Sequence, residues 1–167
     1  MEINFLAVLV AALVPTLIGF VWYHPKVVGT AWMKAADMTE EKMKGANMAL
    51  IFGLSFFFSL MLAMSMNNLT IHQFNIPGLF NVKGQDPVAG SPEAVFIADF
   101  FTKYGTLHRT FAHGMVHGII TMLFFGLPIL ATNAMFERKG WKYILINFGY
   151  WVITIAIMGG IVCGWPK

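Results

Sequence analysis

Charged residues are scarce in this sequence, and their scarcity is its most informative property. Asp, Glu, Lys and Arg make up 11% of the 167 residues, against roughly 25% in a typical soluble domain. Hydrophobic residues make up 57%, and the mean hydropathy is +0.68. A soluble fold of this length cannot bury so much apolar surface, so we expect lipid to surround part of the chain. The net charge of only +3 gives no reason to expect a nucleic-acid partner.

Cysteine and the common catalytic motifs are scarce as well. Cys163 is the single cysteine, which excludes an intrachain disulfide, and its apolar surroundings predict a small packing residue. The sequence contains no Gly-rich phosphate-binding loop and no spacing typical of a Ser-His-Asp triad. We therefore expect a protein that is not an enzyme and that carries no cofactor.

Four apolar stretches are long enough to cross a membrane, which takes about 20 residues for roughly 30 Å of hydrocarbon. They lie at about 3–23, 47–66, 110–136 and 141–165. None has an acidic or basic residue in its interior, which disfavours a carboxylate-driven ion pump. Backbone groups in lipid must bond within their own segment, so each stretch predicts an α-helix, with kinks at Pro15 and Pro128. The expected fold is an all-α membrane bundle of four transmembrane helices, with residues 1–167 as one integral domain.

The basic residues between these stretches predict the orientation in the membrane. Seven lie on one side: Lys26, Lys34, Lys42, Lys44, Arg138, Lys139 and Lys142. Four lie on the other: Lys83, Lys103, Arg109 and Lys167. Because positive charge is enriched in cytoplasmic loops, we expect both termini and the long loop 67–109 to lie outside.

The long loop contains a further helical pattern, "SPEAVFIADFFTKYG", at 91–105. Ser91 suits a helix N-cap and Pro92 suits the first helical position. Five apolar residues fall on one face at helical spacing: Phe96, Ile97, Phe100, Phe101 and Tyr104. The pattern predicts an amphipathic helix at the outer membrane surface, with a lid over a binding site as the alternative. The length of the loop also makes it a candidate surface for a partner.

The stretch "FAHGMVHGII" (111–120) places two histidines in an apolar run. His113 and His117 are four residues apart, so they lie on one face of a helix. They suit a Zn, Cu or Ni site if a third ligand is available, and the outer candidates for it are His108, Asp99 and His72. Contact with a proton or a ligand is a second interpretation. Neutral hydrogen bonding between packed helices is the third, and the neighbouring glycines favour it.

Small residues predict where two of the helices touch. Gly114 and Gly118 are four apart, a spacing that lets another helix approach closely. Ala156, Gly160 and Gly164 repeat this spacing in the fourth stretch. We therefore expect close packing between the third and fourth helices.

Amphipathic aromatic residues gather at the predicted cytoplasmic interface, where such rings anchor helices. The predicted anchors are Trp22, Tyr23, Trp32 and Trp141. A contact between Glu137 and a lysine of the first connection is a further hypothesis, because it would hold the inner ends of the helices together.

Three blocks of the sequence resemble a known family. They are "WYHPKVVGTAW" (22–32), "HGMVHG" (113–118) and "NAMFERKGWKYILINFGYW" (133–151). In combination they are similar to the family catalogued as domain of unknown function 1761, which consists of small bacterial membrane proteins with four predicted helices. The resemblance implies a four-helix fold in the bacterial inner (cytoplasmic) membrane and implies no reaction.

Three functions remain open. Four short helices enclose little room for a pore, so we expect a non-enzymatic subunit that acts as a homo-oligomer or as an accessory component of a larger envelope complex. Its partners would be the lipid bilayer and a second copy or another membrane protein. The alternatives are a small transporter or channel with His113 and His117 in a crevice, and a membrane protein that binds a metal or cofactor through the same histidines.

Overall fold

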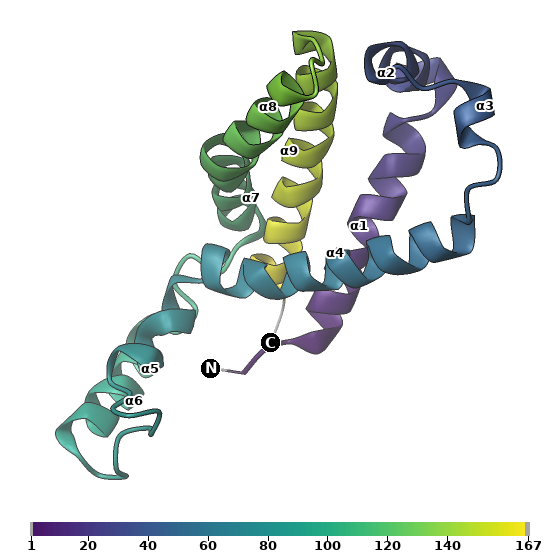
Figure 1. Cartoon of the computed structure of the whole chain (residues 1–167). Coiled ribbons are helices and arrows are strands. Elements are labelled where there is room, and N and C mark those ends of the chain that lie inside the picture. Colours follow the sequence, from purple (N-terminus) through teal and green to yellow (C-terminus); the bar gives the residue numbers. More distant parts are fainter. Residues whose placement is uncertain (1, 166–167) are drawn as a thin grey trace.

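Four long helices dominate the computed structural model, which describes residues 2–165 (Figure 1). They are α1 (Phe5–Trp22), α4 (Met48–Thr70), the continuous helix Phe111–Phe136 and α9 (Trp141–Gly164). Each is long and apolar enough to cross a membrane, and residues 2–165 contain no β-strand. The predicted all-α fold with four membrane-type helices is confirmed.

Polar side chains set the ends of these helices. The Asn4 and Asn47 side chains accept hydrogen bonds of 3.0 Å from the backbone N–H groups of Ala7 and Leu50, and so cap α1 and α4. α4 ends at Thr70 and not near residue 66, where the apolar run stops. The Thr70 hydroxyl is buried and donates to the Met66 carbonyl at 2.8 Å, so the helix continues beyond the apolar residues.

The third long helix contains one wide turn. It consists of α7 (Phe111–Thr121), the π-helical turn η3 (Met122–Gly126) and α8 (Leu127–Phe136). Pro128 lies at the start of α8 and has no N–H to donate to the preceding turn. A π-helical turn therefore lies directly before Pro128, the residue at which the sequence predicts a kink.

The closest packing in the molecule joins α7 to α9. A Cβ atom added to Gly114 would fall on the Gly159 carbonyl, and one added to Gly118 would fall on the Ile155 carbonyl and the Ala156 backbone. Both α7 glycines are buried. The two backbones thus approach as closely as small residues permit.

Phe111 packs on the same face of α9, at the C-terminal end of that helix. A Cβ atom added to Gly160 would meet the Phe111 ring, and one added to Gly164 would meet the Phe111 backbone. The small residues expected to pack against the third helix therefore lie along one line of α9.

α4 crosses α1 and α9 and does not run alongside them (Figure 1). Its buried residues all lie in its C-terminal half: Ser59, Ala63, Met66, Asn67 and Thr70. The N-terminal half, from Met48 to Phe58, is exposed except for a half-buried Phe56. One half of α4 thus packs on the other helices while the other half presents apolar side chains outward.

The long loop forms a small lobe of its own. It contains α5 (Ile76–Leu79) and α6 (Pro92–Tyr104), which extend away from the long helices (Figure 1). Ser91 caps α6 as predicted, accepting from the Ala94 N–H at 3.2 Å. The Phe80 and Phe96 rings lie 5.4 Å apart and hold the lobe together. The location of α6 at a membrane surface stays a prediction.

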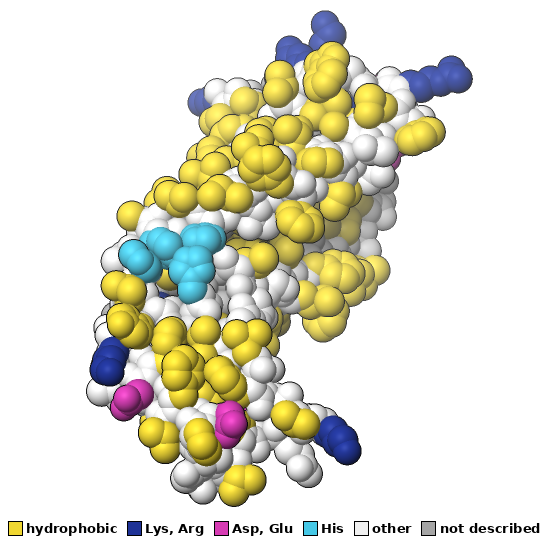
Figure 2. Space-filling model, turned by 90° about the vertical axis from the view of Figure 1, so that its left-hand side faces the viewer, with side chains coloured by type: hydrophobic (Ala, Val, Ile, Leu, Met, Phe, Trp, Pro, Cys, Tyr) yellow, Lys and Arg dark blue, Asp and Glu magenta, His cyan; other side chains and the backbone are white. Residues whose placement is uncertain are grey.

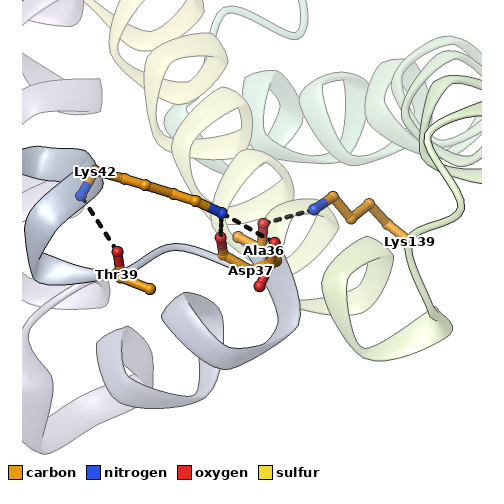
Figure 3. A network of polar contacts seen from close by, with 5 residues as sticks. All are labelled: Ala36, Asp37, Thr39, Lys42 and Lys139. Carbon is orange, nitrogen blue, oxygen red and sulfur yellow. Dashed lines mark hydrogen bonds and ion pairs between the residues drawn. The ribbon is translucent and has the colours of Figure 1, made fainter.

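The first connection and the turn before α9 meet at one end of the helices, which we call the lysine end. The connection consists of η1 (Pro25–Gly29), α2 (Thr30–Ala36) and α3 (Glu40–Met43). Lys139 donates to the Ala36 carbonyl at 2.6 Å, as Figure 3 shows. Glu137 takes part in neither of the two ion pairs among residues 2–165, so the hypothesis that it holds a lysine is wrong. Lys139, and not Glu137, links the two segments, and its partner is a backbone carbonyl.

Lys42 and Asp37 form a second polar contact at the lysine end (Figure 3). The Lys42 ammonium lies 3.0 Å from the Asp37 carboxylate and 2.6 Å from the Asp37 carbonyl. The hydrogen bond and the charge of Lys42 lower the pKa of the Asp37 carboxyl. Both side chains are exposed, so this contact orders the connection without forming a core.

Aromatic residues complete the lysine end. The Trp22 indole donates to the Ile146 carbonyl at 3.2 Å, and the Tyr23 hydroxyl donates to the Asn147 side chain at 3.0 Å. Trp32 lies edge-on to Tyr23 at 5.4 Å between ring centroids, whereas Trp141 is 69% exposed.

Candidate metal centre

Four of the five histidines gather at the other end of the helices, which we call the histidine end. They are His72, His108, His113 and His117, and Figure 2 shows them as one group between the apolar body and the lobe. The His72 ring centroid lies 5.0 Å from that of His113 and 4.8 Å from that of His117. The centroids of His113 and His117 are 4.6 Å apart.

α7 supplies two of these imidazoles in a fixed orientation. The Thr110 hydroxyl caps the helix by accepting from the His113 N–H at 3.2 Å. Each histidine is followed by a glycine that contacts α9, and successive residues of a helix are about 100° apart around its axis. The contact between α7 and α9 therefore also sets the direction in which His113 and His117 point, which is beside α9 and not into it.

His72 comes from the short 3-10 turn η2 (His72–Asn75), directly after α4. Its neighbours Ile71 and Gln73 are 3% and 4% exposed, whereas His72 itself is exposed. The Gln73 amide donates to the carbonyls of Tyr104 at 2.8 Å and Leu107 at 2.6 Å. We call these two hydrogen bonds the Gln73 clamp. They tie the turn that carries His72 to the end of α6, and they leave the His72 ring facing α7.

The three rings of His72, His113 and His117 place ligand nitrogens close together. One nitrogen of each lies within 4.8 Å of the others, and the His72 and His113 Nε2 atoms are 3.1 Å apart. A metal ion bound tetrahedrally at about 2.0–2.1 Å from each nitrogen needs them about 3.3 Å from one another. The separation of the His72 and His113 nitrogens is close to this value, and a nitrogen of His117 lies within 4.8 Å of both residues' ligand atoms.

Asp99 and His24 lie away from the three-histidine group. Asp99 pairs with Lys103 at 3.8 Å and is not in the three-histidine group. His24 lies at the lysine end, where its Nδ1 accepts from the Lys26 N–H at 3.2 Å. The third nitrogen thus belongs to His72, one of three candidates that the sequence could not rank. His72 lies 41 residues before His113, so no helical spacing in the sequence connects the two residues.

His108 lies beside the three-histidine group without belonging to it. Its ring stacks on that of His113, with centroids 5.2 Å apart and an angle of 19° between the planes. Its side chain is exposed, and its backbone has a left-handed φ of 60°. His108 is therefore a neighbour of the site in this structure and not one of the three convergent ligands.

A cavity of about 420 Å³ lies away from the histidines, between α1, α4 and α9. Pro15, Phe52 and Tyr150 are among its mostly apolar lining residues. The Tyr150 hydroxyl donates to the Pro15 carbonyl at 2.8 Å and is thereby satisfied within the protein. None of the four clustered histidines lines this cavity.

The fold and the site together define an all-α, membrane-type protein with a histidine cluster at one end of its helices. The chain belongs to the family described as "Protein of unknown function (DUF1761)", which it matches over residues 6–163. This confirms the family resemblance, and the matched range includes all four clustered histidines. No curated protein and no solved structure matches the chain.

Proposed function

We propose that this protein is a membrane protein that binds a transition-metal ion through His72, His113 and His117. The observation that carries the proposal is the convergence of one nitrogen from each residue within 4.8 Å. Imidazole suits Zn, Cu and Ni, and three imidazoles supply the minimum protein ligand set of a typical zinc site. The role is binding of the ion, with no catalytic step.

The contacts of the rings leave most of their nitrogens without a hydrogen-bond partner among the described residues. Among residues 2–165, the one side-chain hydrogen bond of these three imidazoles is that between His72 and His113. A neutral imidazole has one nitrogen lone pair, and an ion placed between the rings accepts all three lone pairs at once. No carboxylate of the described residues joins the group, so the ligand set would consist of neutral nitrogens.

The proposed setting follows from the distribution of charge. The basic residues near the lysine end favour placing that end in the cytoplasm of a bacterium, with both termini and the histidine end outside the inner membrane. His113 is in the first turn of α7, so an ion from the outer solution would reach the site without crossing the membrane.

Metal analysis of the purified protein tests the proposal. The chain would be incubated with Zn²⁺ in detergent, separated from free ion by gel filtration and analysed for metal content. We expect one ion per chain for the unaltered protein and for His24→Ala, whose histidine lies at the lysine end. His72→Ala should retain little or none. Unaltered protein that elutes without zinc would contradict the proposal.

Self-association is a second proposal, and the exposed half of α4 favours it. Leu54 and Phe57 lie on this half, 47% and 55% exposed. We propose that a second copy covers this surface in the membrane. Cross-linking of Leu54→Cys in membranes should give a dimer, whereas Leu9→Cys, an exposed position on α1, should not. Little dimer from Leu54→Cys would indicate that lipid, and not a second copy, covers this surface.

A further inference from the structure

The backbone around His108 is held against the histidine end at several points. The His108 carbonyl accepts from the Thr110 N–H at 2.9 Å and from the Cys163 thiol at 3.6 Å. The Arg109 guanidinium donates to the Cys163 carbonyl at 2.7 Å, which ties the next residue to the end of α9. The Gln73 amide holds the Leu107 carbonyl just before it. The chain on both sides of His108 is therefore fixed near the three ligand nitrogens.

The conformation of His108 itself directs its side chain toward the site. A left-handed φ of 60° is uncommon for a residue with a Cβ atom, although His, Asn and Asp adopt it more often than others. With the neighbouring peptides fixed, the sign of φ decides the direction of the Cα–Cβ bond. Here that direction places the imidazole on the face of the His113 ring. Asp37, Lys83 and Arg138 have a similar φ in turns elsewhere, so what distinguishes His108 is the contact of its ring with His113.

We propose that His108 is the fourth ligand of the metal ion, an inference that rests on the proposed function. In the structure its ring stacks on His113 and makes no nitrogen contact with the three-histidine group. Because the side chain is exposed, it is free to rotate about its two side-chain torsions while the backbone stays in place. When an ion is present, the ring leaves the stack and one of its nitrogens coordinates the ion.

A fourth imidazole determines what the site does. Zinc sites with four protein ligands are closed, whereas catalytic sites keep one position for a water molecule. His72 from η2, His108 from the turn before α7, and the two histidines of α7 would fill all four positions. No position would remain for an activated water. The site then holds or transfers an ion and does not hydrolyse a substrate.

Replacing zinc by Co²⁺ gives a direct test, because tetrahedral Co²⁺ absorbs visible light far more strongly than Co²⁺ with additional water ligands. The variant to compare is His108→Asn. Asn is also enriched at left-handed φ, so it keeps the backbone conformation and removes only the imidazole. His24→Asn, at the lysine end, is the matched control. His108→Gly is a second variant, because glycine adopts this φ at no steric cost.

We expect the unaltered protein and His24→Asn to bind one Co²⁺ with strong visible absorption. His108→Asn and His108→Gly should bind Co²⁺ more weakly by at least the roughly 10-fold that loss of an outer-shell partner costs, with a weaker spectrum as water enters the fourth position. If the unaltered protein binds no Co²⁺, the proposed function itself fails. If it binds Co²⁺ and both His108 variants keep its affinity and spectrum, the three-ligand site stands and the fourth-ligand inference is wrong.

Discussion

The histidine end and the lysine end of the helices both carry polar side chains, but they use them differently. At the lysine end the polar groups bond mainly to backbone: His24 accepts from Lys26 N–H, and Lys139 donates to the Ala36 carbonyl. At the histidine end, the imidazoles of His72 and His113 face each other. The same residue type is a helix cap in one place and a potential ligand in the other.

This difference distinguishes a candidate site from a helix cap without any sequence motif. A histidine that bonds to a nearby backbone group has its structural role explained by that bond. Histidines whose nitrogens converge from separate segments have no such local explanation, and a shared ligand is the economical one. The following predictions test this difference and the contacts that hold the histidine end together, beginning with the largest expected effect.

Replacing both α7 histidines should remove metal binding. His113→Gln combined with His117→Gln leaves one of the three convergent nitrogens, so we expect Zn²⁺ affinity to fall by more than about 100-fold, beyond the loss typical of an outer-shell partner. Isothermal titration of the protein in detergent measures this. Helical content should be unchanged, because the glycines and not the histidines contact α9. A variant that loses its helical structure would instead support a packing role.

Widening the contact between α7 and α9 should destabilise the histidine end. In Gly114→Ala the new methyl group meets the Gly159 carbonyl and the Cys163 side chain, and such overpacking costs about 1–3 kcal/mol. Thermal unfolding in detergent should show a lower midpoint. Gly53→Ala is the matched control in α4, where an added Cβ atom meets nothing within 4 Å. Equal midpoints for the two variants would contradict the close contact.

Removing the Gln73 clamp should weaken the site without removing a ligand. Gln73→Leu keeps the approximate size of the side chain but leaves the Tyr104 and Leu107 carbonyls without their shared donor. Because His72 is next in the chain, we expect Zn²⁺ affinity to fall by about 10-fold, as for other outer-shell partners. Gln85→Leu, an exposed position in the lobe, should bind normally. Normal affinity in Gln73→Leu would show that the turn holds His72 without the clamp.

The smallest effect is expected at the lysine end. His24→Ala removes the side-chain acceptor for the Lys26 N–H, and loss of a helix cap costs about 0.5–2 kcal/mol, toward the lower limit at an exposed site. Chemical unfolding in detergent measures this change. Zn²⁺ affinity should be unaltered, because His24 lies at the opposite end from the cluster. A loss of affinity in this variant would mean that the two ends are coupled.

The helices were predictable because their cause is local. An apolar run without charge must form a helix in lipid, and the ends of α1 and α9 fall within two residues of the runs that predict them. The end of α4 was predicted too early, because Thr70 is polar in sequence but buried and bonded in the fold. The Glu137 hypothesis failed for a related reason: the sequence shows which charges are present and not which group each side chain can reach.

The order of residues alone therefore specifies the four helices, the small residues that let α7 approach α9, and the shared face of His113 and His117. All of these depend on a spacing of a few residues along one helix. The position of His72 depends instead on the direction in which α4 crosses the other helices and on the bonds of Gln73 to a turn more than 30 residues away. Only the folded chain brings that third imidazole to the other two, because no local periodicity determines how separate helices meet.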